Sequence, residues 1–234
     1  NVTNTLTRGK TVGFRFTAND TLGYSAQSSI FTYTVANTPP TCTAGTINNT
    51  SPKTNDVINQ TGCVYSDADG DSQGTSLFKW FLNLVEIAGQ TLKTLNLATG
   101  GNGNKGQTIN ASEAPYDGFD YGSYINVSTF ATVANTAPTA PTILYPTNNL
   151  LVSDNSIDIN ITYTADADSD AITSIRYYIN GILNSTSTGN STFNATDGTY
   201  TLNVSIFDGT SWSANTSIDS FKLDIISPTD NLLT

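Results

Sequence analysis

The chain has 234 residues, which is enough for one large domain or for two domains of about 100 residues, each with its own core. Nine basic and 19 acidic residues give a formal net charge of −10, which opposes binding to nucleic acids and to anionic membranes. Histidine is absent, and this excludes the commonest general base, the usual zinc ligand and any Ser-His or Cys-His pair. No run in this segment approaches the roughly 18 apolar residues of a membrane span.

An internal repeat organises the chain. The stretch that begins with RGKT at Arg8 and ends in TVANTPPT resembles the stretch that begins with KGQT at Lys105 and ends in TVANTAPT. The chain opens inside a repeat and lacks methionine, so we expect a processed product or an excerpt of a longer chain. The repeat predicts the second half of one unit (1–38), two whole units (39–137 and 138–227), and the first strand of a further unit or a donated strand (228–234).

Two runs of aspartates at alternate positions follow predicted strands, in SDADGD and ADADSD. Carboxylate oxygens at this spacing suit calcium, which takes six to eight hard oxygen ligands. The EF-hand pattern fails, however, because Ser72 stands at its required glycine and Phe78 at its bidentate glutamate. The other interpretation is a solvated turn that ends a strand. The candidate ligands are Asp67, Asp69 and Asp71 in the first run, and Asp166, Asp168 and Asp170 in the second.

The segment 77–97, LFKWFLNLVEIAGQTLKTLNL, has leucines at helical spacing but also adjacent Trp80 and Phe81 and a break at Gly89. Aromatic residues favour strands and glycine interrupts a helix, so we interpret the segment as strand, turn and strand.

Apolar and polar residues alternate in the last repeat at 157–164, 200–206 and 221–225. Each pattern predicts a strand with one buried face and one solvent face. Asn180-Gly181, between two strand-like runs, predicts a hairpin turn. Short strands at spacings of about ten residues predict an all-β fold of tandem β-sandwiches.

Thirteen N-x-[ST] sequons are present, roughly twice the number expected by chance from this composition. N-linked glycans at these sites would place the chain outside the cell or on its surface, and the two cysteines fit an oxidising compartment. The alternative is compositional bias toward Asn, Ser and Thr. The acceptors are Asn1, Asn19, Asn48, Asn49, Asn59, Asn110, Asn126, Asn160, Asn184, Asn190, Asn194, Asn203 and Asn215.

The joints NTPPT and NTAPT, the SDADGD loop, WFLNLVEIAG, KGQTINAS and DGTYTLNVSIFDGTSWS together resemble the tandem immunoglobulin-like, PKD- or cadherin-like repeats of archaeal or bacterial cell-surface and filament proteins. The resemblance covers nearly the whole chain. It implies immunoglobulin-like β-sandwiches arranged as an elongated rod, with Trp80 in the core. Ala111 and Phe14 stand where the second bridging cysteine is expected, so the resemblance implies that Cys63 pairs with Cys42 or with no partner.

The cadherin-like arrangement further implies that acidic loops meet at one pole of each sandwich. Asp117 and Asp120 would then support the first aspartate run, and Asp208 the second.

The expected function is a structural segment of a heavily N-glycosylated extracellular filament, stalk or cell-surface protein, with calcium as a candidate cofactor. Its partners would be copies of itself or neighbouring repeats of the same long chain. An enzyme is not expected, because the acids lie on predicted exposed loops and only Glu86 and Glu113 are glutamates.

The alternative function is an adhesin-type module that binds a glycan or a partner protein. Four aromatic residues could form a sugar-stacking platform, although their alternation with small polar residues favours packing within strands. These residues are Tyr116, Phe119, Tyr121 and Tyr124.

Overall fold

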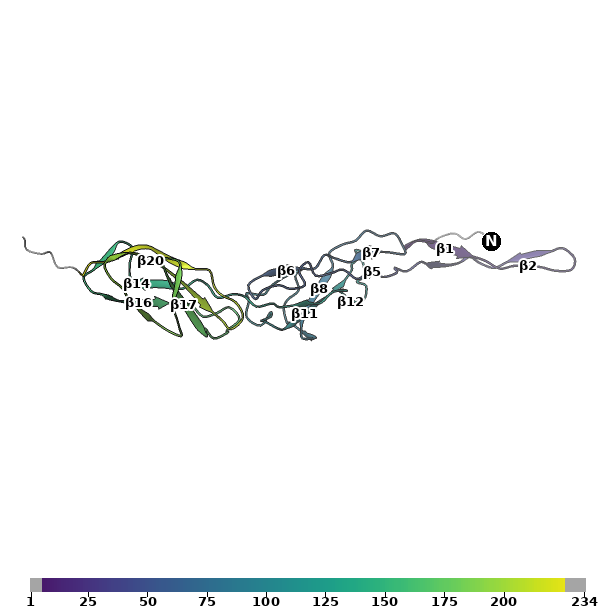
Figure 1. Ribbon diagram of the computed structural model, residues 1–234. Coiled ribbons are helices and arrows are strands. Elements are labelled where there is room, and N and C mark those ends of the chain that lie inside the picture. Colours follow the sequence, from purple (N-terminus) through teal and green to yellow (C-terminus); the bar gives the residue numbers. More distant parts are fainter. Residues whose placement is uncertain (1–5, 226–234) are drawn as a thin grey trace, which may run out of the picture. The chain divides into compact units, whose positions relative to one another are not determined.

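The computed structural model describes residues 6–225, which form strands and turns without any helix (Figure 1). The predicted all-β fold is therefore confirmed, and this part of the chain holds no helix that could span a membrane. The predicted repeat boundaries stay a prediction, and the predicted strand at 228–234 lies outside the described residues. The chain divides into two compact units: unit 1 holds 1–52, 56–103 and 107–133, and unit 2 holds 53–55, 104–106 and 134–234.

Two antiparallel two-stranded ladders, one nested within the other in sequence, form the segment that the sequence predicts to be half a repeat. Strand β1 pairs with β4, with Thr11 opposite Thr34, and the same register recurs later in unit 1, where Thr108 lies opposite Thr132. This shared register is the structural counterpart of the sequence repeat. The strands are β1 (Thr11–Phe14), β2 (Thr17–Asn19), β3 (Ser25–Gln27) and β4 (Phe31–Thr34).

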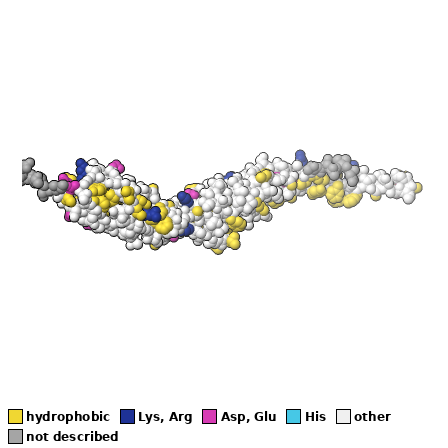
Figure 2. All heavy atoms as spheres, viewed as in Figure 1, with side chains coloured by type: hydrophobic (Ala, Val, Ile, Leu, Met, Phe, Trp, Pro, Cys, Tyr) yellow, Lys and Arg dark blue, Asp and Glu magenta, His cyan; other side chains and the backbone are white. Residues whose placement is uncertain are grey.

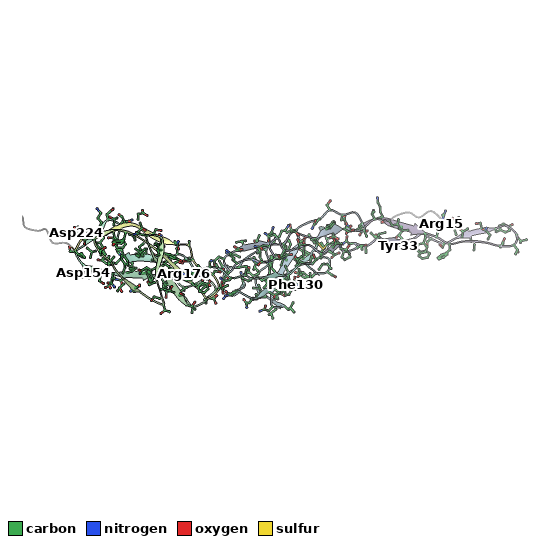
Figure 3. All side chains as sticks on the ribbon, viewed as in Figure 1. Arg15, Tyr33, Phe130, Asp154, Arg176 and Asp224 are labelled. Carbon is green, nitrogen blue, oxygen red and sulfur yellow. A yellow bond between two sulfur atoms is a disulfide. The ribbon has the colours of Figure 1, made fainter. Side chains whose placement is uncertain are left out.

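Aromatic side chains lie exposed on this hairpin segment, where Figure 2 shows hydrophobic atoms at the surface. The rings of Phe14 and Phe31 stack with their centroids 5.6 Å apart, and Phe16 meets both edge-on. Tyr33, labelled in Figure 3, lies opposite Val12 in the same ladder. Among the described residues, no strand pairs with the second edge of β1.

The rest of unit 1 is built from two two-stranded ladders and one larger sheet. Strand β5 pairs with β7, β6 pairs with β10, and the larger sheet has the order β12-β11-β8-β9 with β13 also on β11. The strands are β5 (Thr41–Thr43), β6 (Val57–Asn59), β7 (Val64–Ser66), β8 (Leu77–Leu82), β9 (Val85–Glu86), β10 (Thr94–Asn96), β11 (Thr108–Ala114), β12 (Ile125–Asn126) and β13 (Ala131–Thr132).

Trp80 is the centre of the unit 1 core, as the resemblance implied. Its side chain is fully buried, and its Nε1 donates a hydrogen bond to the carbonyl oxygen of Leu92 at 2.9 Å. Ala111 lies opposite Trp80 in β11 and leaves room for the indole ring. A disulfide joins Cys42 in β5 to Cys63, the residue before β7.

Unit 2 is a β-sandwich of two sheets. One sheet has the order β15-β21-β20-β17-β18, and the other has the order β14-β16-β19. The strands are β14 (Thr142–Tyr145), β15 (Leu150–Val152), β16 (Ser156–Thr162), β17 (Ser174–Ile179), β18 (Ile182–Ser187), β19 (Ser191–Asn194), β20 (Gly198–Phe207) and β21 (Thr216–Leu223).

The alternating residues of the last repeat form the core between these two sheets. Ile157 and Ile159 from β16 pack with Leu202 and Val204 from β20 in one buried cluster. Two positions of the pattern were wrong: Tyr163 follows the end of β16 and Ile225 follows the end of β21, and both are exposed because each ladder stops before them. Arg176, labelled in Figure 3, covers the Trp212 ring from β17 at 3.9 Å.

Both predicted turns are present. Asn180 and Gly181 have φ values of 49° and 78°, as a type I′ hairpin turn requires, and join β17 to β18. In unit 1 the turn between β8 and β9 consists of Asn83 and Leu84, which also have positive φ values. The predicted strand, turn and strand in 77–97 is therefore confirmed, but the hairpin turn lies at Asn83 and Leu84, ahead of the predicted break at Gly89, which lies in a separate turn with a φ of 79°.

Removal of the disulfide should destabilise unit 1 alone. The bridge closes 21 positions of sequence, which in the chain-entropy model stabilises the fold by about 3 kcal/mol. We expect Cys42→Ser with Cys63→Ser to raise hydrogen exchange in the buried strands of unit 1, measured by mass spectrometry. Unit 2 has no cysteine and serves as the internal control, so equal acceleration in both units would contradict the prediction.

The buried Tyr177 should make unit 2 sensitive to alkali. Burial raises the pKa of Tyr177 to about 12 from its ordinary 10, and its hydroxyl donates to the carbonyl oxygen of Gly189 at 2.6 Å. The folded state thus holds the proton more tightly, so this contribution to stability is present below pH 10 and is lost as the pH rises toward 12.

Tyr177→Phe removes both the hydrogen bond and the titration. In denaturant titrations we expect the variant to be less stable than wild type by about 1 kcal/mol at pH 8. This difference should narrow above pH 10, and a difference that stays constant up to pH 12 would contradict the assignment.

Candidate functional site

The first aspartate of each run folds its loop. Asp67 Oδ1 accepts hydrogen bonds from the backbone N–H groups of Asp69 at 2.8 Å and Asp71 at 3.0 Å. In unit 2, Asp166 Oδ1 accepts from Asp168 at 2.8 Å and from Asp170 at 3.4 Å. These local bonds turn the chain back on itself, and each run consequently brings one oxygen from each of its three carboxylates within 4.8 Å of the others.

A second acidic turn lies in each unit. Asp117 Oδ1 accepts from the N–H groups of Phe119 and Asp120, both at 2.7 Å. Asp208 Oδ1 accepts from those of Thr210 and Ser211, both at 2.6 Å. Burial raises the pKa of the Asp117 and Asp208 carboxyls, but the hydrogen bonds outweigh burial and the net pKa of each is lowered. Both carboxylates therefore stay ionised at neutral pH.

An asparagine of the TVANT motif binds each acidic turn. Asn37 Nδ2 donates to Asp117 Oδ2 and to Asp120 Oδ2, each at 2.9 Å. Asn135 Nδ2 donates to Asp208 Oδ2 at 2.9 Å and to the Ser211 hydroxyl at 3.1 Å. The same side chain thus makes the same contact in both units.

The threonine after each asparagine binds the aspartate run. The N–H of Thr38 donates to Asp69 Oδ2 at 2.7 Å, and the N–H of Thr136 donates to Asp168 Oδ2 at 2.5 Å. In unit 2 the hydroxyl of Thr54 donates to the other oxygen of Asp168. The Asn-Thr pair therefore connects the acidic turn to the aspartate run.

A basic residue neutralises the last aspartate of each run. Arg8 contacts Asp71 through two bonds, Nε to Oδ2 at 2.9 Å and Nη2 to Oδ1 at 3.1 Å, and its hydrogen bonding lowers the pKa of the Asp71 carboxyl. Lys105 Nζ lies 2.7 Å from Asp170 Oδ2, and this hydrogen bond raises the pKa of the Lys105 ammonium. These ion pairs are partly exposed, so each contributes little stability of its own.

Four oxygens in these two assemblies are buried without a hydrogen-bond partner, and the two in unit 1 match the two in unit 2 by position in the repeat. They are Asn37 Oδ1 and Asp67 Oδ2 in unit 1, and Asn135 Oδ1 and Asp166 Oδ2 in unit 2. Asp166 and Asp168 are only 7% and 6% exposed. A buried carboxylate oxygen without a partner loses its hydration with no compensation, so its environment calls for a bound water or ion.

The structure thus brings together the predicted aspartates and adds four recurring side chains that sequence reasoning missed, besides the hydroxyl of Thr54 and the backbone amides of Thr38 and Thr136. Asp117, Asp120 and Asp208 were expected to support the runs, and they reach them through a TVANT asparagine. The four side chains recur at steps of 97 or 98 positions, and this recurrence was the available signal. They are Arg8, Asn37, Lys105 and Asn135.

The four aromatic candidates do not form one platform. Tyr116 and Tyr121 stack on each other with their centroids 4.4 Å apart, in a small antiparallel bridge. Arg8 covers the Phe119 ring at 3.4 Å, and Lys79 lies 5.0 Å from the Tyr124 ring. Pairing and cation contacts thus account for these rings, in line with the strand-packing interpretation.

The two glutamates make unrelated contacts. Glu86 is exposed and forms an ion pair with Lys79 at 2.8 Å. Glu113 is buried, and its Oε2 accepts the N–H of Cys63 at 2.8 Å.

The described sequon asparagines differ in exposure, and Asn1 lies outside the described residues. Asn110 is buried, and Asn49, Asn59, Asn160 and Asn203 are partly exposed. The exposed acceptors are Asn19, Asn48, Asn126, Asn184, Asn190, Asn194 and Asn215.

No protein-family profile and no curated protein matches the sequence. Among solved structures, the chain is similar to the fibronectin(III)-like modules of Clostridium thermocellum CbhA, with 14% identity, a TM-score of 0.35, and 79% of this chain and 94% of that chain covered. For the FN1–FN3 domains of chicken CNTN1 the values are 12%, 0.33, 89% and 76%, and for two fibronectin type III domains of chicken tenascin they are 12%, 0.37, 77% and 98%. At these TM-scores the similarities carry no argument about function or partners.

Proposed function

We propose that the chain is a structural spacer from an extracellular filament, stalk or cell-surface protein built of tandem immunoglobulin-like repeats. The observation that carries this proposal is the recurrence of one contact set in both units, made by basic, Asn and Thr residues of the repeat on two acidic loops. A contact set that recurs with the sequence repeat is part of the framework of the repeats. A site for one substrate or ligand does not need such a recurrence.

An extracellular location is supported by two features. The disulfide between Cys42 and Cys63 forms and persists in oxidising compartments. Seven sequon asparagines are exposed among the described residues, and an N-glycan attached there would point into solvent. We propose N-linked glycans at these positions.

The second candidate function is binding of a glycan or protein ligand, and one hollow favours it. A cavity of about 280 Å³ is lined by Pro39, Pro40, Tyr121 and Ile125. Prolines beside an exposed tyrosine ring offer a rigid apolar surface for stacking. This hollow lies in unit 1 and is not part of the recurring contact set, so we rank this function second.

A change in the number of repeats tests the spacer role against binding. In cells that display the chain from an anchored fusion, we expect removal of residues 138–227 to bring a tag at its free end closer to the cell surface, as measured by electron microscopy. Surface display should be retained. Tyr121→Ala is the matched test of binding, and loss of adhesion or glycan binding with that variant, at unchanged reach, would contradict the spacer role.

The buried sequon Asn110 should remain unmodified. It lies in the middle of β11 opposite Phe81, and its Oδ1 accepts the N–H of Ala111 at 2.7 Å. A glycan there would have to open the sheet, so a folded chain should carry none. We expect glycopeptide mass spectrometry to find glycan at Asn126, an exposed sequon of the same unit, while an occupied Asn110 in folded protein would contradict the structure.

A further inference from the structure

We infer that each unit binds one calcium ion between the aspartate run, the acidic turn and the TVANT asparagine. This ligand set is larger than the three aspartates of one run, because it also includes the amide oxygen of an asparagine from a distant segment. This inference concerns the chemistry of the loops and does not depend on the spacer role.

The three carboxylates of each run lie close enough together to share one ion. Calcium binds oxygens at 2.3–2.6 Å, so two ligands on opposite sides of one ion lie up to about 5 Å apart. The three carboxylates of each run offer oxygens within 4.8 Å of one another, which fits a single ion of this size.

Unit 2 also holds two buried oxygens without a hydrogen-bond partner, and this observation is independent of the carboxylate spacing. Asp166 is more than nine-tenths buried, and its Oδ2 has no partner, while Oδ1 of the same carboxylate is occupied by backbone N–H groups. Asn135 Oδ1 is also unpaired, and the neighbouring Thr136 N–H holds this segment against Asp168. Two buried acceptors of different chemistry, one carboxylate and one amide oxygen, therefore remain without donors in two segments that Thr136 and Asp168 join.

The aspartate run of unit 2 carries more negative charge than the basic side chain in contact with it neutralises. Asp166, Asp168 and Asp170 stand together, and among the described residues that contact them the only basic side chain is Lys105. Close carboxylates repel each other, and burial of the first two strengthens this repulsion. A divalent cation would remove it.

Unit 1 repeats the arrangement with matching residues. Asp67 Oδ2 and Asn37 Oδ1 are the unpaired oxygens, and Arg8 takes the place of Lys105 at Asp71. Because the Arg8 fork engages both oxygens of Asp71, we expect this carboxylate to contribute less to the ion than Asp170 does in unit 2.

The donor set selects the ion. All candidate ligands are carboxylate or amide oxygens, without the nitrogen or sulfur that zinc and copper prefer. Magnesium demands near-ideal octahedral geometry and gives up water reluctantly, whereas calcium accepts irregular sets of six to eight oxygens and can complete them with water.

The test is calcium titration of the whole 234-residue chain by isothermal calorimetry after removal of divalent ions. We expect two equivalents for wild type, and one each for Asp166→Asn and for Asp67→Asn. Asp158→Asn is the matched control, since it makes the same charge change at an exposed site in β16 and should retain two equivalents. Magnesium chloride at equal ionic strength should bind at least about tenfold more weakly.

Near-ultraviolet circular dichroism in chelator shows whether each variant is folded before titration. If Asp166→Asn fails to fold, Asn135→Ala replaces it, and we expect calcium affinity in unit 2 to fall by about tenfold or more. No calcium-dependent heat in folded wild type at millimolar calcium would overturn the inference, as would two equivalents retained by Asp166→Asn. In either case the spacer role would stand, because its test is reach from the cell.

Discussion

The hydrogen bonds from backbone amides to the first aspartate of each run are the contacts on which the rest of the site depends. With Oδ1 of Asp67 or Asp166 engaged by two N–H groups, the loop turns and carries the following carboxylates to one place. Only then can the second carboxylate accept a threonine amide and the third accept a basic side chain. Because the bonds are local in sequence, the loop can form its turn from its own backbone and first aspartate.

The two units stabilise their sandwiches by different means. Unit 2 has a core with large side chains from both sheets, including Tyr177 from β17 and Phe193 from β19, and holds no disulfide among its described residues. In unit 1 the strands β5 to β7 are short, and one large side chain, Trp80, packs against small residues such as Ala111. The Cys42–Cys63 disulfide, between β5 and the residue before β7, compensates for these short strands. It does so because it lowers the conformational entropy that the chain gains on unfolding.

Much of the fold was predictable from the sequence because strand periodicity and turn chemistry are local. The alternation at 200–206 and the turn at Asn180-Gly181 required no knowledge of distant residues. The site was predictable only in part: aspartates at alternate positions are visible in the sequence, but the partners Asn37 and Asn135 reach them through tertiary contacts. Their neutral side chains give no pattern, and only the repeat connects them to the acids.

Polar contacts of this kind respond to the surroundings in ways that a core and a disulfide do not. Apolar burial varies mainly with temperature, and the Cys42–Cys63 bridge varies with redox conditions. Ion pairs such as Lys105 with Asp170 weaken as salt screens them, whereas buried carboxylates near each other gain when a cation arrives. Directional bonds to Asp168 also favour one arrangement of the segments over sliding alternatives, which apolar contacts alone would permit. The proposed calcium site would therefore make the local structure of each unit depend on the calcium concentration of its surroundings.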